Sequence, residues 1–312
     1  MKKNLLSSLI ASTVLFSLQA LALPAPDTES VAAEKVVQTN ETTEKKADTP
    51  AKPLLLTSKE SFEKSNAIRT AIKEKNQAAA KAITGPRLWY AGFGLEGSSK
   101  AFAGDVKLTG DRLKALYPDL ISYVAYNDQT VEQMQVPLAT LTGIENTTFE
   151  IGKLANPQDM AVIMMSSHGN EHILGLKLDG EYYGPITDNY LEINLRKLKQ
   201  MPMLIIISAC HSGSMIPRLK AENRIILTAA AANKVSYGCQ PLSENTFFID
   251  ALMGKAPDPS MSLNQLFVKL KDDIAAREQK EKLAPSEPQM FVGEKMKKFA
   301  DLPISAWLKS PG

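Results

Sequence analysis

The sequence predicts an α/β fold in which a mainly parallel sheet is flanked by helices. Five short apolar runs have the length and the aliphatic and aromatic composition of buried strands. Amphipathic stretches that favour helices lie between most of these runs. Parallel strands need long crossover connections, so this alternation is most simply explained by a parallel sheet covered by helices on both faces.

Composition limits the number of domains and the kinds of partner. A chain of 312 residues with 44% hydrophobic and 22% charged residues can bury one sizeable core and carry additional segments. The formal charge is only +2. A chain so close to neutral gives no indication of nucleic-acid binding, and we expect no nucleic acid among its partners.

Residues 1–22 have the three parts of a secretory signal peptide. Lys2 and Lys3 precede an apolar stretch over residues 5–18, and a small-x-small pattern follows at residues 20–22. A membrane anchor is the alternative, but polar residues interrupt the stretch and it is shorter than the roughly 20 residues that a bilayer span requires. We therefore expect cleavage near Leu23, a periplasmic or secreted protein, and no stable membrane insertion afterwards.

Two segments precede the expected α/β domain. Residues 23–57 are dominated by Ala, Pro, Thr, Glu and Lys and indicate a disordered linker. Residues 58–85 are rich in helix formers, with Ser58 as a capping residue and Pro86 as a stop, and are expected to be a helical spacer or a propeptide. Residues 86–312 are the predicted domain.

Within that domain the order of elements follows from the apolar pattern. Strands are expected at residues 87–93, 120–126, 160–166, 203–208 and 224–230. Helices are expected at residues 105–117, 136–154 and 188–200, the last with Asp188 as the candidate N-cap. A short hairpin is expected at residues 172–184, and an amphipathic helix at residues 262–278.

Two of the expected strands end on residues suited to catalysis. The run at 160–166 leads to His168 and Gly169, and the run at 203–208 leads to Cys210. Sites in open parallel sheets form beyond the carboxyl ends of the strands, so neighbouring strands would bring these residues to one edge. A cysteine at a strand-to-helix turn is favoured as a thiolate, and an imidazole beside it can protonate a leaving amine. The backbone N–H groups of Gly169 and Cys210 are candidate oxyanion donors, and His211 is expected to be structural.

These residues also have other interpretations. A cysteine after an apolar run is often only a small buried hydrophobe. Cys210 could also pair with Cys239 in an oxidising compartment, but a permanent disulfide would abolish a nucleophile, so we expect free thiols. The segment from His168 to His172 formally matches the zinc motif H-x-x-E-H, which needs a helix to bring both imidazoles to one face. Since it follows a strand directly and contains Gly169 and Asn170, we expect no metal site there.

The two blocks together resemble the legumain (asparaginyl endopeptidase) and GPI-transamidase family of the caspase-like clan. The resemblance rests on Ser-His-Gly and Ser-Ala-Cys-His-Ser-Gly-Ser-Met, each after an apolar run, and extends over roughly residues 87–296. Bacterial members look closest at the segments 90–94, 236–239 and 286–289. It implies a caspase/haemoglobinase-like three-layer fold and hydrolysis of peptide bonds in a protein or peptide substrate, through a thioester and without a cofactor.

The chain also departs from the family's pattern. Legumains carry Asp immediately before the His, whereas this chain has Ser167. In place of the family's Arg-His pocket pair, this chain offers Lys100 and Phe102. Ser236 and Tyr237 match positions in the wall of the pocket, and Lys100 is a candidate reader of acidic side chains.

Three functional interpretations remain open at this point. An exported cysteine endopeptidase with Cys210 as nucleophile and His168 as acid/base is favoured. A transamidase with the same dyad would have identical motifs, because either water or an amine can resolve the thioester. A non-catalytic envelope protein on a peptidase fold is the third. The sequence does not indicate an oligomeric state.

Overall fold

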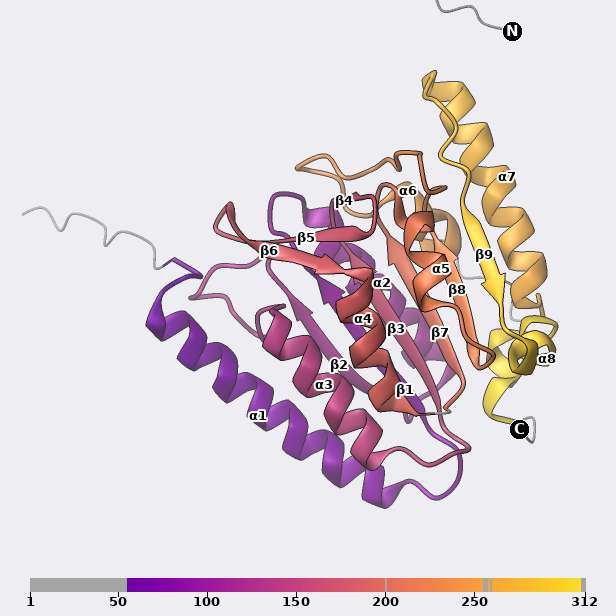
Figure 1. The fold of residues 1–312 in the computed structure, drawn as a ribbon. Coiled ribbons are helices and arrows are strands. Elements are labelled where there is room, and N and C mark those ends of the chain that lie inside the picture. Colours follow the sequence, from indigo (N-terminus) through magenta and orange to yellow (C-terminus); the bar gives the residue numbers. More distant parts are fainter. Residues whose placement is uncertain (1–54, 200, 255–257, 259, 310–312) are drawn as a thin grey trace, which may run out of the picture. The chain divides into compact units, whose positions relative to one another are not determined.

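The computed structural model describes residues 55–199, 201–254, 258 and 260–309 (Figure 1). The predicted signal peptide, residues 1–22, and the predicted linker as far as residue 54 lie outside the described residues. Among the helices of the described part, none is both long enough and apolar enough to cross a membrane.

A six-stranded sheet with the order β2-β1-β3-β7-β8-β9 forms the centre of the fold. The first five strands pair in parallel, and β9 runs antiparallel to β8 at one edge. This confirms the predicted mixed α/β fold with a mainly parallel sheet flanked by helices. Its strands are β1 (Leu88–Gly94), β2 (Ile121–Tyr126), β3 (Met160–Ser166), β7 (Met203–Ser208), β8 (Arg224–Thr228) and β9 (Gln289–Val292).

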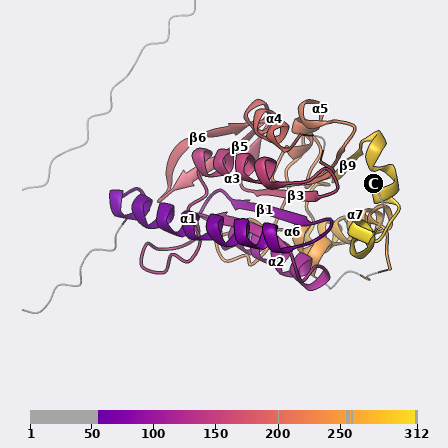
Figure 2. The ribbon, with the colours of Figure 1, turned by 90° about the horizontal axis from the view of Figure 1, so that it is seen from below.

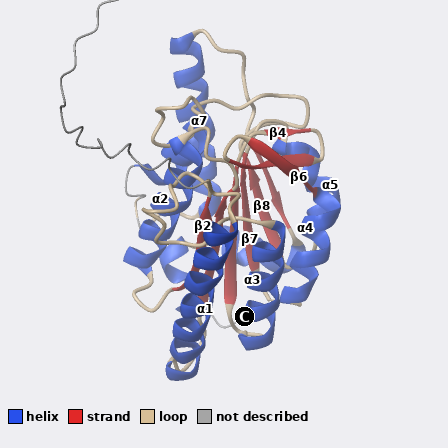
Figure 3. Ribbon diagram, turned by 90° about the vertical axis from the view of Figure 1, so that its left-hand side faces the viewer, coloured by secondary structure: helices blue, strands red, loops and turns tan. Residues whose placement is uncertain are grey.

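The helices cover the sheet on both faces, as Figures 2 and 3 show. One face carries α1 (Lys59–Ala82), α3 (Leu141–Leu154), α4 (Asp188–Leu195) and α5 (Ile216–Leu219). The other face carries α2 (Lys100–Leu116), α6 (Phe247–Ile249), α7 (Leu263–Glu281) and α8 (Lys297–Ala300). Short 3₁₀ turns lie at Arg196–Leu198, Ser212–Met215, Glu294–Met296 and Ile304–Lys309, and a π-helical turn lies at Asp250–Gly254.

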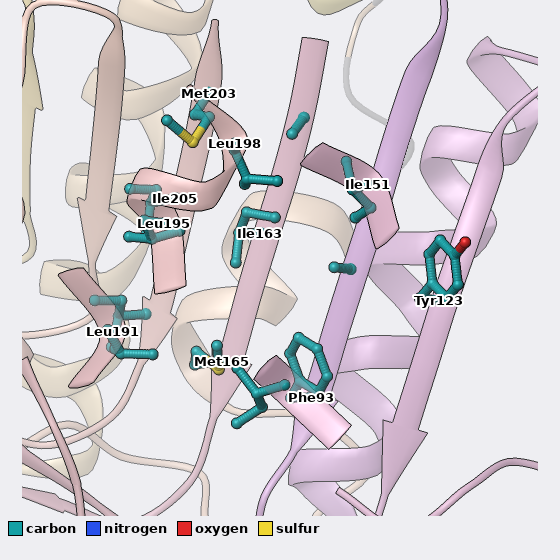
Figure 4. Packing of buried hydrophobic residues seen from close by; sticks show 14 of the residues in the cluster. Phe93, Tyr123, Ile151, Ile163, Met165, Leu191, Leu195, Leu198, Met203 and Ile205 are labelled. Carbon is teal, nitrogen blue, oxygen red and sulfur yellow. The ribbon is translucent and has the colours of Figure 1, made fainter. Parts of the chain in front are cut away.

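Alternate side chains of the buried strands supply the two cores. Phe93 and Ile163 point towards the face of α3 and α4, where they pack with Ile151 and Leu195 (Figure 4). Tyr90 and Met164 point the other way, among the side chains of α2, α6 and α7. Because strands buried on both faces read as continuous apolar runs, all five predicted strands were recognisable.

The N-terminal ends of α2, α3 and α4 differ in position or in cap from those predicted. Helix α2 begins five residues earlier than expected, at Lys100, because the Ser99 side chain accepts a hydrogen bond from Ala101 N. Helix α3 begins later, at Leu141, with Thr140 as its cap. Thr187, not Asp188, is the N-cap of α4, since its hydroxyl accepts a hydrogen bond from Tyr190 N.

A second, three-stranded antiparallel sheet lies at the carboxyl end of the central strands (Figure 1). It consists of β4 (Gly169–Asn170), β5 (Ile173–Leu178) and β6 (Glu181–Thr187). The pair β5 and β6 is the predicted hairpin, with its turn at Asp179 and Gly180, both at positive φ. The short strand β4 was not predicted, and it begins directly after His168.

Candidate active site

The register of β3 and β7 brings His168 and Cys210 to the same edge of the sheet. Ser166 and Ser208 are paired in this register, and Ser167 N donates to Ser208 O at 3.1 Å. His168 and Cys210 each follow two residues after that pair. The two strands therefore deliver both side chains beyond their carboxyl ends, where the sequence placed them.

Gly169 lies directly against the backbone of Cys210. A Cβ atom at Gly169 would lie 2.4 Å from Cys210 O and 2.9 Å from Ala209 Cβ. Only a residue without a side chain fits this approach. The small residues at these two strand ends thus allow the His168 and Cys210 segments to touch.

The Cys210 thiol is free and half-buried, and three atoms of Ser236 lie close to its sulfur. Ser236 N lies 3.3 Å from Sγ, Ser236 O lies 3.6 Å away and Ser236 Oγ lies 3.7 Å away. A backbone N–H directed at the sulfur is suited to stabilising negative charge on it. The family resemblance matched Ser236 to the wall of a substrate pocket, and its contact with the Cys210 thiol was not anticipated.

The turn that carries Cys210 leads into a 3₁₀ turn and the four-residue helix α5, so the helix that follows the thiol in sequence is short. Within the described residues the backbone N–H of Cys210 donates no hydrogen bond. His211 has a left-handed backbone, its N–H donates to Lys234 O at 2.7 Å, and its ring Nδ1 lies 3.1 Å from Ala232 O. His211 is thereby held against the loop after β8, which agrees with the structural role expected for it.

Phe102 supports the imidazole of His168. The two rings meet edge to face, with centroids 5.0 Å apart and planes at 82°, and Phe102 is buried at the start of α2. Ser167, the residue before the histidine, donates from its Oγ to Gly175 O at 2.7 Å. His168 O accepts a hydrogen bond from Gly175 N at 2.9 Å. The Phe102 ring and the hydrogen bond between Gly175 and His168 thus hold the histidine in place.

The remaining predicted site residues lie in two places. Tyr237 follows Ser236, and its hydroxyl donates to Ala284 O at 2.9 Å. Lys100 is exposed at the N-terminus of α2, and its backbone N–H donates to Pro241 O. Cys239 is a second free thiol, and burial, together with the nearby Cys210, raises its pKa above the usual value.

The H-x-x-E-H segment is not helical. His168, Gly169 and Asn170 run from the end of β3 into β4, and His172 has a positive φ and faces Asp188, with Nδ1 to Oδ2 at 2.9 Å. The two imidazoles therefore do not share a helix face, as a zinc peptidase of this motif requires. Among the described residues, no group of three or more His, Cys, Asp or Glu side chains is arranged to hold a metal ion.

Asp105, a buried carboxylate behind the site, was not predicted from the sequence. It lies one turn after Phe102 among the buried residues of α2 and is 0% exposed. Its Oδ2 accepts a hydrogen bond from Ser166 Oγ at 2.7 Å. An acidic residue among the apolar positions of a helix would have indicated a buried carboxylate. Because the helix was predicted to begin at residue 105, Asp105 was expected to be its first residue and not part of its buried side.

The chain was compared with protein families and with curated proteins. The model of the peptidase C13 family matches residues 114–298, which is more than half of the chain and includes both His168 and Cys210. No curated protein matches the chain. With the match over this span and the caspase-like layered α/β fold in agreement, the chain belongs to the peptidase C13 family, that of legumain and the GPI transamidase.

Proposed function

We propose that the protein is an exported cysteine endopeptidase that cleaves peptide bonds with Cys210 as nucleophile and His168 as acid/base. The observation that carries this proposal is the β3–β7 register, in which both residues follow the paired Ser166 and Ser208 by two positions. Membership of a cysteine-peptidase family supports the same chemistry. Residues 1–22 support export, with a mature chain that begins near Leu23 and is released into the periplasm or the medium.

In the proposed reaction, the Cys210 thiolate attacks the carbonyl carbon of the scissile peptide bond. The backbone N–H groups of Cys210 and Gly169 bind the oxyanion that develops. His168 then gives its proton to the departing amine, and the acyl group remains on Cys210 as a thioester. Finally His168 accepts a proton from water, the resulting hydroxide attacks the thioester, and the carboxylic acid product leaves as the thiol is regenerated.

Intact-protein mass spectrometry of the exported, mature protein tests this proposal. The protein would be treated with peptidyl chloromethyl ketones and aza-peptide epoxides that vary the residue before the cleaved bond. We expect one label per chain, located on Cys210, at a rate that depends on that residue and on His168. The mass of the unlabelled protein should correspond to a chain that starts near Leu23.

Matched variants separate the alternatives. Cys210→Ala and His168→Ala should abolish labelling, whereas Cys239→Ala should retain it, because Cys239 is the other thiol of the chain. Equal labelling of both thiols in a folded sample, or none at all, would favour a non-catalytic protein on this fold. Adding a peptide amine while the enzyme turns over a peptide substrate measures transfer of the acyl group to the amine against hydrolysis, and predominant transfer would indicate a transamidase.

The residue preference of the labels tests the predicted pocket. Ser236, Tyr237 and Lys100 are the proposed substrate-binding residues, and Lys100 is the proposed reader of an acidic side chain. If so, Lys100→Ala should reduce labelling by reagents with Asp before the cleaved bond more than labelling by those with Asn. An unchanged ratio would remove Lys100 from the pocket.

A further inference from the structure

The carboxylate of Asp105 is buried directly behind the strand ends that carry the dyad. Its Oδ2 accepts hydrogen bonds from Ser166 Oγ at 2.7 Å and Thr246 Oγ1 at 2.9 Å. Its Oδ1 accepts from Thr246 N at 2.9 Å and lies 3.4 Å from Asn245 Nδ2. Among the described residues no lysine or arginine forms an ion pair with it, so hydroxyl and amide donors alone stabilise its charge.

The donors come from the segments that build the active site. Ser166 ends β3 two residues before His168, and Thr246 caps α6 after the loop that carries Ser236. Ser208, two residues before Cys210, lies 2.8 Å from Thr246 Oγ1. One turn before Asp105 on the same helix, Phe102 packs against the His168 ring. Asp105 thus connects α2 with both strand ends and with the loop around the thiol.

We propose that Asp105 is a positioning residue, whose ionised carboxylate holds the ends of β3 and β7 and the cap of α6 in the arrangement that the Cys210–His168 dyad needs. This inference rests on the proposed function of that dyad. It assigns a role to the one buried carboxylate of the described chain that faces the site from α2.

The direction of each hydrogen bond explains why ionisation matters. Thr246 Oγ1 has one proton and donates it to Asp105, so the bond between Ser208 and Thr246 must be donated by Ser208. When the carboxylate is ionised, Ser166 and Thr246 therefore donate to it and Ser208 donates to Thr246. Protonation of Asp105 would add a second hydrogen between it and one of these hydroxyls, which would then have to turn away. When Thr246 is the hydroxyl that turns, its hydrogen bond with Ser208, two residues before Cys210, is disrupted. When Ser166 turns, the bond that is lost lies two residues before His168.

Burial raises the pKa of Asp105 from 3.8 to about 6, although hydrogen bonds from Ser166 and Thr246 lower it in part. The titratable groups that face it are Tyr90 of β1 and Cys239 of the loop after β8, with His168 and Cys210 beyond the strand ends. The pKa of Tyr90 is raised by burial and then by the Asp105 charge. Asp250, after α6, is exposed and pairs with Arg277. A transition of the network near pH 6 follows from this setting.

The test is the pH dependence of Cys210 reactivity, measured as the rate of alkylation by iodoacetamide and as kcat/KM on a cleaved peptide. In Ser166→Ala the carboxylate loses a donor that stabilises its charge, so its pKa should rise further. We expect the acid limb of both profiles to move to higher pH by roughly half a unit or more. In Asp105→Asn this component of the limb should disappear, with at least a tenfold loss of kcat at pH 7.5 and a smaller change in KM.

The control is Asp159→Asn, at the opposite end of β3. Asp159 is also 0% exposed, but it pairs with Arg87 at 2.8 Å and accepts from Trp89 Nε1 at 2.8 Å. Its substitution should lower the melting temperature without moving the acid limb. An acid limb set by His168 alone would stay in place in Ser166→Ala and in Asp105→Asn, and that result would overturn the proposal. If Asp105→Asn fails to fold, Ser166→Ala still decides.

If Cys210 and His168 do not form a catalytic dyad, the measurements give a different result. In that case wild-type Cys210 would show no His168-dependent reactivity at any pH, and both proposals would fall. If wild-type Cys210 is reactive and the wild-type pH profile matches those of Ser166→Ala and Asp105→Asn, the dyad is retained. Asp105 is then not a positioning residue for it.

Discussion

At the scale of single residues, the close approach at Gly169 leads to a sharp prediction. Gly169→Ala places a Cβ within 2.4 Å of Cys210 O, so the β3 and β7 ends must move apart. A displacement of about 1 Å between catalytic groups can cost roughly 100-fold in rate. We expect kcat/KM to fall by about that factor while the far-ultraviolet circular dichroism stays unchanged.

Gly175→Ala is the matched control, because Gly175 lies in β5 and its backbone N–H donates to His168 O. A Cβ at Gly175 would make only ordinary contacts, the nearest at 3.6 Å from Glu96 Oε2 and from His168 O. Its activity should remain within a few-fold of wild type. Equal losses in the two alanine variants would contradict the geometric explanation.

The predictability of each site residue follows from where its signal lies. Cys210 and His168 could be found because each follows a continuous apolar run, and the sheet geometry then fixes their relative position. The contacts of Ser236 with the thiol depend on the path of the loop after β8, which has no repeating pattern. Asp105 required knowledge of which hydroxyls its helix would face, since only tertiary structure supplies its four donors.

At the scale of elements, helix α1 is packed into the domain. Its Ile72, Ala79 and Ala80 contribute to the core on the α3 face. Asn76 Nδ2 donates to Ser122 O of the edge strand β2 at 2.8 Å, and Arg69 donates to Leu138 O at 3.0 Å. A helix that covers an edge strand in this way protects it from pairing with other chains.

These contacts lead to a prediction on the predicted spacer or propeptide, residues 58–85. Asn76→Ala should lower the free energy of unfolding by about 1–2 kcal/mol, because the side chain is buried and its hydrogen bond to the edge strand is lost. Glu74→Ala, at an exposed position of the same helix, should change it by less than about 0.5 kcal/mol. Urea denaturation of the three proteins measures both values. If Asn76→Ala is as stable as wild type, α1 is a loosely held segment that could be released as a propeptide.

The elements themselves were predicted unequally well, for physical reasons. The stripe from Leu263 to Ile274 identified α7 because an amphipathic helix repeats its apolar positions over several turns, and those residues are buried. The edge strand β9 has only four residues, between Pro288 and Gly293, and was missed. Such a short strand is defined by its pairing with β8 and not by any periodicity of its own.

At the scale of the whole molecule, the ionisation of Asp105 connects folding stability to pH. A carboxyl with a pKa of 3.8 in the unfolded chain and about 6 in the folded one holds its proton more tightly when folded. Between about pH 4 and pH 6 the folded state therefore binds more protons than the unfolded state, and stability falls as the pH rises. The effect is at most roughly 3 kcal/mol, and it persists above pH 6, where the buried carboxylate is charged.

The stability difference between wild type and Asp105→Asn isolates this contribution. Carboxyls with lowered pKa values, such as Asp258 with its hydrogen bonds from Ser260, act in the opposite direction in both proteins and cancel. Urea unfolding from pH 4 to pH 7 should show the variant gaining stability relative to wild type as the pH rises through 4 to 6. Parallel profiles would mean that Asp105 has an ordinary pKa in the folded protein. A gain in stability together with the loss of activity in the same variant would mean that the charged carboxylate weakens the fold and is retained for the arrangement of the strand ends.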